Sequence, residues 1–268
     1  MNLKSQKFHL HFGLEKPVRI LQLTDVHLSL ADDIDGDDMK ERAAHRRDVF
    51  FREAEFPERD PVGYLEEAME YSKEFDCTVI TGDLIDFNSH ANREMAKKIL
   101  AGYDYLFCPG SHEFAPKVGI HDTFEYKREH WDEVQSPFRG DMEFESRIVG
   151  GVNLISMDNS YYLWTQRQFD LLKQEVAKGL PIVLFCHCAF DSPAILQTPG
   201  TNFKTLTRTK EEADFTISVN EYIFNEPLIK TAFSGHYHGM GGTASMGEKE
   251  GYVLAPLFKG IVGEITID

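Results

Sequence analysis

Five short segments of this sequence end an apolar run with Asp or His side chains that could bind metal ions. In the first, Asp25 and His27 follow Val18–Leu23, and a spacing of two in an extended chain puts both side chains on one side. A DxH pair alone occurs often by chance, because Asp at a strand end is more commonly a turn former. The other segments therefore decide whether this pair belongs to a site.

The second and third segments add a carboxylate and an imidazole. Asp83 lies in the stretch GDLID directly after the apolar run Thr78–Thr81, so it should emerge at the same sheet edge as the first pair. Its two carboxylate oxygens could bridge two ions. His112, with Ser111 beside it, follows the run Tyr105–Cys108. Taken alone, this third segment indicates only a turn.

The fourth segment places His187 between two cysteines at the end of the run Ile182–Cys186. If the chain stays extended there, Cys186 and Cys188 face away from the histidine. We therefore expect both thiols in the core and the imidazole in the site.

The fifth segment presents His236 and His238 in a glycine-flanked turn after Thr231–Ser234, again with a spacing of two. Each segment alone has an ordinary explanation as a hydrogen-bonded histidine or a polar strand end. Together they supply imidazole and carboxylate in the proportions that borderline divalent metals prefer. The sequence therefore predicts a metal centre formed by Asp25, His27, Asp83, His187, His236 and His238.

The elements that must position these residues alternate along the chain. Apolar runs rich in β-branched residues recur with helix-like segments between most of them, which predicts a layered α/β fold around central sheets. Helices are predicted after the cap pair Asp60-Pro61 and after the capping-box pattern that begins at Thr165. The C-terminal stretches Tyr252–Leu257 and Gly263–Ile267 are predicted to be closing strands.

Two stretches depart from this alternation within what we expect to be a single domain over residues 1–268. Residues 31–60 form a densely charged insertion, for which a solvated helix and a mobile lid are both open. Its acidic start lacks the spacing of an EF-hand calcium loop, so we interpret it as a solvated turn. Residues 191–227 are rich in Thr, Asn and Pro and are expected to be a loop-rich segment that could contact substrate.

The composition narrows the class of partner. Lys and Arg number 28 against 44 Asp and Glu, which gives a formal net charge of −16 and disfavours binding to a nucleic-acid backbone. A small anionic substrate remains compatible, because bound cations would dominate the potential inside a pocket. The pattern predicts no particular oligomeric state.

The sequence also suggests where the protein works. The N-terminal stretch MNLKSQKFHLHFG has no apolar run followed by a small-residue cleavage site, and the longest apolar run is too short to span a bilayer. The cysteines, with no paired CxxC spacing, read as reduced core residues. We expect a soluble cytoplasmic protein with no membrane partner.

The order DxH, GDxxD, GSHE, a lone His after an apolar strand, and GHxH resembles the calcineurin-like metallophosphoesterase superfamily. That family has the pattern DxH, GDxxD, GNHE or GNHD, H, GHxH, and the resemblance runs from about Val18 to the C-terminus. It implies a four-layer α/β sandwich, with two central mixed sheets flanked by helices and the site at the strand ends. It also implies two divalent metal ions, for which imidazole and carboxylate admit manganese, iron, zinc or nickel.

The resemblance implies a role for each matched residue. The first ion would be bound by Asp25, His27, Asp83 and His238, and the second by Asp83, His187 and His236. The asparagine whose amide oxygen usually reaches the second ion is Ser111 here, with its oxygen one bond closer to the backbone. We expect Ser111 to act through a bridging water or a shortened loop, and the second ion to bind more weakly than the first.

The implied activity is hydrolysis of a small phosphate ester, either a monoester or a diester. A hydroxide held between the two ions would attack the phosphorus, while His112 would protonate or stabilise the leaving oxygen and Asp86 would hold its ring. The alternative is a metal-binding or scaffold protein of the same fold with impaired catalysis, which only Ser111 favours. A serine hydrolase is disfavoured because there is no GxSxG turn.

Several aromatic and amide side chains lie just beyond the site segments. They could stack on a base or aryl group of the substrate, or they could simply pack in the core. They are Phe87, Asn88, Phe114, Tyr161, Tyr162 and Trp164.

Overall fold

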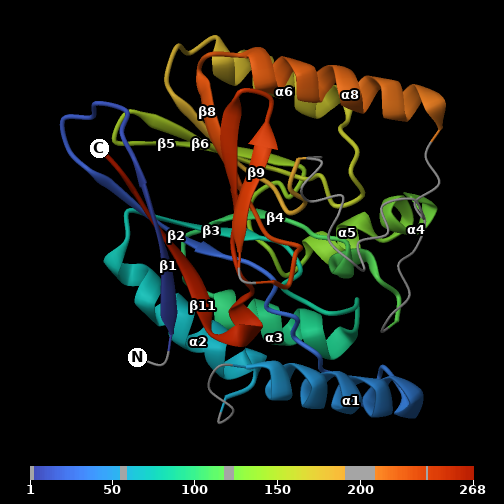
Figure 1. The fold of residues 1–268 in the computed structure, drawn as a ribbon. Coiled ribbons are helices and arrows are strands. Elements are labelled where there is room, and N and C mark those ends of the chain that lie inside the picture. Colours follow the sequence, from blue (N-terminus) through green and yellow to red (C-terminus); the bar gives the residue numbers. More distant parts are fainter. Residues whose placement is uncertain (1–2, 55–58, 118–123, 191–208, 240) are drawn as a thin grey trace.

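The structure is a computed structural model that describes residues 3–54, 59–117, 124–190, 209–239 and 241–268. Two β-sheets lie at its centre, with helices on their outer faces (Figure 1). No helix in this described part is long and apolar enough to cross a membrane.

The first sheet has five strands in the order β1-β11-β2-β3-β4. The strands are β1 (Lys4–Leu10), β2 (Val18–Leu23), β3 (Cys77–Thr81), β4 (Leu106–Cys108) and β11 (Ile261–Ile267). Strands β2, β3 and β4 run parallel, so their carboxyl ends meet at one edge. Only the β11–β2 pair is antiparallel.

The second sheet has six strands in the order β5-β6-β7-β8-β10-β9. The strands are β5 (Phe144–Val149), β6 (Val152–Met157), β7 (Ile182–Phe185), β8 (Ile229–Ser234), β9 (Gly242–Met246) and β10 (Lys249–Val253). Strands β6, β7, β8 and β10 run parallel, and the hairpin strands β5 and β9 pair antiparallel at the two sides.

Alternation along each strand explains the layers. In β2, Ile20 packs in a buried cluster between the sheets together with Phe185 and Phe233 of the second sheet. The neighbouring Leu21 and Leu23 point to the opposite face, into the cluster that the helices cover, as the period of two in a strand requires. The expected four-layer α/β sandwich of two mixed sheets and flanking helices is confirmed.

The helices cover the outer faces of the two sheets. Helices α2 (Pro61–Tyr71) and α3 (His90–Leu100) pack on the first sheet, while α6 (Gln166–Val176) and α8 (Lys210–Asn225) pack on the second. Both predicted helix starts are confirmed. Asp60 accepts a hydrogen bond from the backbone N–H of Gly63, and Thr165 forms the predicted capping box.

Some expectations need correction. Residues 210–225 of the segment expected to be loop-rich form α8, so that expectation is wrong there; residues 191–208 lie outside the described residues. The predicted strand Tyr252–Leu257 stops at Val253, and Leu257 begins the 3₁₀ helix η4 (Leu257–Lys259). The charged insertion contains helix α1 (Asp37–Glu53). Strands β1, β5 and β9 were not predicted.

We predict that Phe233→Ala destabilises the fold by about 3–5 kcal/mol, because it opens a cavity between the sheets. The Phe233 ring is fully buried and contacts Phe185 and Phe8 at centroid distances of 5.7 and 5.1 Å. Urea unfolding measures the change. The control Ile217→Ala, at a side chain 55% exposed on α8, should stay within about 0.5 kcal/mol of the parent protein. Equal stabilities for the two variants would contradict this account of the core.

Candidate metal centre

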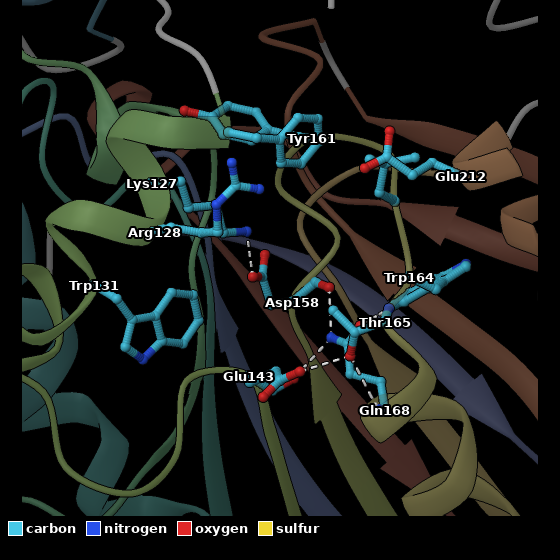
Figure 2. A pocket seen from close by; sticks show the side chains of 12 residues that line it. Lys127, Arg128, Trp131, Glu143, Asp158, Tyr161, Trp164, Thr165, Gln168 and Glu212 are labelled. Carbon is cyan, nitrogen blue, oxygen red and sulfur yellow. Dashed lines mark hydrogen bonds and ion pairs between the residues drawn. The ribbon is translucent and has the colours of Figure 1, made fainter. Parts of the chain in front are cut away.

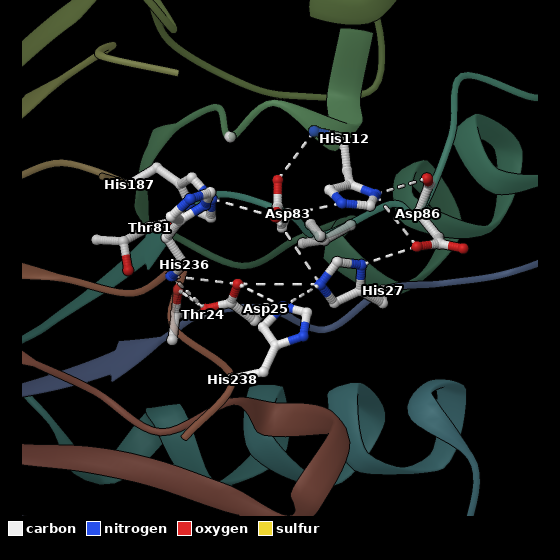
Figure 3. A network of polar contacts seen from close by, with 12 residues as sticks. Thr24, Asp25, His27, Thr81, Asp83, Asp86, His112, His187, His236 and His238 are labelled. Atoms are coloured by element: carbon white, nitrogen blue, oxygen red, sulfur yellow. Dashed lines mark hydrogen bonds and ion pairs between the residues drawn. The ribbon is translucent and has the colours of Figure 1, made fainter. Parts of the chain in front are cut away.

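The predicted site residues come together at the carboxyl ends of strands from both sheets. The loops after β2, β3 and β4 carry the residues of the first three segments, and the loops after β7 and β8 carry those of the last two. Figure 3 shows the side chains pointing toward one another in one polar network. The network contains Asp25, His27, Asp83, Asp86, His112, His187, His236 and His238.

Unusual backbone conformations turn these side chains inward. In the described part of the chain, positive φ angles occur at five residues other than glycine, a conformation that is costly for such residues and clusters at functional sites. Four of the five are predicted metal ligands, namely Asp25, His27, Asp83 and His236, and the fifth is Tyr162. The backbone strain is therefore concentrated at the predicted metal centre.

Two glycines let neighbouring loops approach the carboxylates. A Cβ atom on Gly110 would lie 2.1 Å from Oδ1 of Asp83, and one on Gly235 would lie 2.4 Å from Oδ2 of Asp25. Both distances are far below van der Waals contact, so only glycine fits at these positions. The backbone N–H of His112 then donates to Asp83 Oδ1 at 2.9 Å, and that of His236 donates to Asp25 Oδ2 at 2.9 Å.

One half of the centre groups two carboxylates with two imidazoles. His27 Nε2 lies 2.9 Å from His238 Nε2, and His238 Nε2 lies 3.3 Å from Asp25 Oδ1. Asp83 Oδ2 lies 3.8 Å from His27 Nε2. One donor atom from each of these four residues lies within 4.8 Å of the others, which suits a divalent cation bound by nitrogen and oxygen.

The other half depends on the tautomer of His187. Its Nδ1 lies 2.8 Å from the carbonyl oxygen of Thr81 and must donate, because a carbonyl only accepts. In the neutral ring, Nε2 then carries a lone pair, yet it lies 3.1 Å from Asp83 Oδ2 and 3.1 Å from His236 Nδ1. The Nε2 lone pair and the Asp83 carboxylate oxygen are then two facing acceptors, which require a proton or a metal cation between them.

The charges around these two rings shift the pKa values of His187 and His236 in opposite directions. Burial alone would lower the pKa of His187, but the carboxylate of Asp83 raises it to about 10. Burial and the neighbouring His187 lower the pKa of His236 to about 3. Buried carboxylates thus lie against converging imidazoles, some of which are held protonated and others neutral by their neighbours. The donor set fits the metal ions that the sequence predicts.

His112 and Asp86 form a second predicted pair beside the metal ligands. His112 Nδ1 lies 2.9 Å from the carbonyl oxygen of Asp86 and 3.2 Å from its Oδ1, so Nδ1 donates and Nε2 is left facing the centre, 4.0 Å from Asp83 Oδ2. Burial would lower the pKa of His112, but Asp83 and Asp86 raise it to about 9. The ring therefore holds a proton that it could pass to a reacting oxygen.

The sequence pattern of the calcineurin-like phosphoesterases matches residues 18–240. The chain belongs to this family. Among solved structures, a dimetal phosphatase from Danio rerio is similar, with 13% identity over 91% of this chain and 89% of that chain and a TM-score of 0.49. A Thermus thermophilus protein is 13% identical over 91% of each chain, with a TM-score of 0.43. No curated protein matches the sequence.

Sequence reasoning missed the part of this phosphoesterase centre that α1 supplies. Arg46 grips Asp86 with two hydrogen bonds, from Nε to Oδ2 at 2.7 Å and from Nη2 to Oδ1 at 2.8 Å. One turn later, Phe50 stacks on His27 with ring centroids 5.0 Å apart. The insertion thus includes a helix, and its inner face forms a wall of the site. The spacing of four between Arg46 and Phe50 was the available signal.

Glu113 is a second residue of the site that the sequence pattern did not predict. Its buried carboxylate accepts hydrogen bonds from the backbone N–H groups of Asp83, Leu84 and Gly110, at 2.9, 2.7 and 2.6 Å. These bonds tie the loop after β3 to the loop after β4. Burial and the charge of Asp83 raise the pKa of Glu113 to about 7. Its role is to hold Asp83 in place.

The cysteines and Ser111 give a mixed outcome. Cys186 packs in the core of the second sheet as expected. Cys188 is fully buried, as expected, but the chain bends at residues 187–188 instead of staying extended, and the thiol lies within 4.8 Å of donor atoms of His187 and His236. Ser111 is nearly buried between Gly110 and His112, in the loop that cradles Asp83.

The candidate stacking residues are mostly enclosed. Phe87, Phe114 and Tyr161 are almost fully buried, which supports a packing role for them. Tyr161 and Trp164 also line a cavity of about 470 Å³ (Figure 2). This cavity lies between α4 (Phe124–Glu129), α5 (Trp131–Gln135) and α6, at the carboxyl end of β6. Because β6 is the neighbour of β7 in the second sheet, this cavity lies one strand away from the loop that carries His187.

We predict that Arg46→Ala weakens metal binding by roughly 10- to 100-fold, because partners of ligand-orienting groups typically contribute that much. Burial would raise the pKa of Asp86, but the bonds from Arg46 hold it well below its usual range, so the variant leaves a buried carboxylate with fewer donors. Calorimetric titration with Mn²⁺ measures the loss. The control is Arg42→Ala, which removes only an exposed pair with Asp38 on the same helix. Equal affinities for the two variants would show that Arg46 has no part in the site.

Proposed function

We propose that this phosphoesterase hydrolyses phosphomonoesters or phosphodiesters at a centre of two divalent metal ions. The observation that supports it most is the position of Asp83, whose carboxylate lies between two separate groups of donors. One group adds Asp25, His27 and His238, and the other adds His187 and His236. A carboxylate shared in this way suits a pair of ions that act together on one phosphoryl group.

Each residue has a distinct task in this proposal. Asp25, His27, Asp83 and His238 would hold the first ion, and Asp83, His187 and His236 the second, with Ser111 at the position of the family's asparagine. When bound, manganese, iron, zinc or nickel ions would supply a nucleophile at neutral pH and offset charge on the phosphoryl oxygens.

The protein's own proton chemistry centres on His112. Because Nδ1 of its ring donates to Asp86, Nε2 is the atom available to pass a proton to the leaving oxygen. Asp86 fixes the ring of His112 and, through a 3.0 Å contact with Nδ1, that of His27 as well. One carboxylate thereby orients both a metal ligand and the proposed acid.

The competing proposal is a metal-binding or scaffold protein with impaired catalysis. Ser111 favours it, because the family's amide donor is missing at that position. The intact network around Asp83, Asp86 and His112 favours turnover, since a scaffold needs no oriented acid. Measured hydrolysis separates the two.

The substrate and setting are inferred from charge and cysteine chemistry. A net charge of −16 supports a small phosphate ester rather than a nucleic acid. The four cysteines are free and buried, which supports a reducing, cytoplasmic compartment.

We expect metal-stripped protein to release nitrophenolate from bis-p-nitrophenyl phosphate or p-nitrophenyl phosphate only when a divalent metal is returned. Manganese, zinc, nickel and iron(II) are added back singly, and the ratio of the two rates sorts diester from monoester preference. His112→Ala should lower kcat by about 10²–10⁴, the usual contribution of a positioned acid.

The control for folding is the metal affinity of the His112→Ala variant, which should match that of the parent protein. Metal binding without hydrolysis under any metal would favour the scaffold. Full activity in His112→Ala would remove this residue from the mechanism.

A further inference from the structure

The second half of the metal centre is one donor short of the first. Four residues with carboxylate or imidazole groups converge around the first ion's position, whereas the proposed ligands of the second are Asp83, His187 and His236. The family's fourth donor is an asparagine amide, and Ser111 stands in its place with a shorter side chain. The structure shows which other donor lies nearby.

Cys188 is that donor. One atom each from His187, Cys188 and His236 lie within 4.8 Å of one another. With Zn–S near 2.3 Å and Zn–N near 2.0–2.1 Å, a sulfur and a nitrogen on one ion lie at most about 4.4 Å apart. The described side chains are thus close to a ligand arrangement already. The two imidazole nitrogens lie 3.1 Å from each other.

The loop holds the thiol in this position. Cys188 is fully buried, and Asn159 clamps its backbone, accepting from Cys188 N–H at 2.9 Å and donating to its carbonyl oxygen at 2.7 Å. The thiol donates to the carbonyl oxygen of Ser160 at 3.9 Å, and the Tyr162 ring meets His236 edge-on at 5.7 Å. Supporting bonds of this kind are typical around metal ligands.

An ordinary core cysteine would look different. Cys186, two residues earlier, packs among the apolar side chains of the second sheet, and its thiol contacts the Cys188 carbonyl oxygen at 3.3 Å. The Cys188 thiol also contacts a carbonyl oxygen, that of Ser160 at 3.9 Å, but after the bend at residues 187–188 it lies within 4.8 Å of both imidazoles as well. Among the described residues other than glycine that have positive φ, Tyr162 is the one that is not a predicted ligand, and its ring lies against His236.

We propose that Cys188 is a ligand of the second metal ion, in place of the family's asparagine. The proposal rests on the proposed two-ion function. On binding, the thiol loses its proton to solvent and coordinates as the thiolate. A thiolate with two imidazoles selects zinc, cobalt or nickel over manganese and magnesium. The second site therefore prefers zinc, cobalt or nickel. The replacement of asparagine by Ser111 predicted a weakly bound second ion, and with Cys188 as a ligand that expectation holds for manganese only.

Cobalt(II) tests the assignment, because sulfur ligation produces an intense near-ultraviolet charge-transfer band that nitrogen and oxygen ligands do not. Metal-stripped protein is titrated with Co²⁺ while absorbance and bound metal are followed. We expect the band to develop with one of two bound ions. It should persist in Cys186→Ala and disappear in Cys188→Ser, with at least about a 10-fold loss of affinity for that ion.

A second variant guards against a general loss of structure. In the double variant Ser111→Asn/Cys188→Ser, the family's amide donor returns, so the second ion should bind again without the sulfur band. Circular dichroism and thermal unfolding of the metal-free proteins establish that each variant is folded. Two bound Co²⁺ ions without a band, no more than one bound ion in the parent protein, or a band that survives in folded Cys188→Ser would each overturn the assignment.

Hydrolysis of bis-p-nitrophenyl phosphate by the same cobalt-loaded samples keeps the two proposals distinguishable. A sulfur band without hydrolysis would count against the phosphoesterase activity and leave Cys188 as a ligand. Hydrolysis without the band would overturn the role of Cys188 alone.

Discussion

The architecture of the centre depends on one buried carboxylate, that of Asp83. It receives the backbone N–H of His112, lies 3.1 Å from His187 and 3.8 Å from His27, and sits in a loop fixed by three backbone hydrogen bonds to Glu113. A charge this deep in the protein is expensive unless it is compensated. The two sheets supply the compensation together, because the strand ends that converge on Asp83 come from both.

The charged insertion shows how a surface helix can become part of such a site. The outer face of α1 is solvated, with exposed pairs such as Arg42–Asp38. On its inner face, Arg46 binds Asp86 through both carboxylate oxygens, and its guanidinium also lies 4.5 Å from the centroid of the Phe50 ring. Asp86 in turn orients His27 and His112. A bidentate arginine is a geometric constraint as well as a charge, so α1 is coupled to the ligands through Asp86.

The sequence pattern predicted the strands that carry the site, because their apolar character is a local property of the chain. The apolar runs that end in Asp or His correspond to strands β2, β3, β4, β7 and β8, because a buried parallel strand needs continuous apolar character. It missed β1, whose first four residues are all polar, and β9, in which polar side chains alternate with apolar ones, and it could not foresee that Arg46 reaches Asp86, 40 residues along the chain. The bend that brings Cys188 near the imidazoles was missed for the same reason. Alternation holds only while the chain is extended, and the bend after β7 is a tertiary feature.

That bend also bears on how a metal site tolerates the loss of a ligand. Donors here sit on short loops after separate strands, and each loop reaches the centre independently, so a donor lost from the loop after β4 can be replaced from the loop after β7 without moving a strand. The replacement changes the chemistry, because a thiolate is softer than an amide oxygen. In the proposed site, serine at position 111 together with cysteine at position 188 leaves the first ion's ligands the same as the family's and changes which metals the second position prefers.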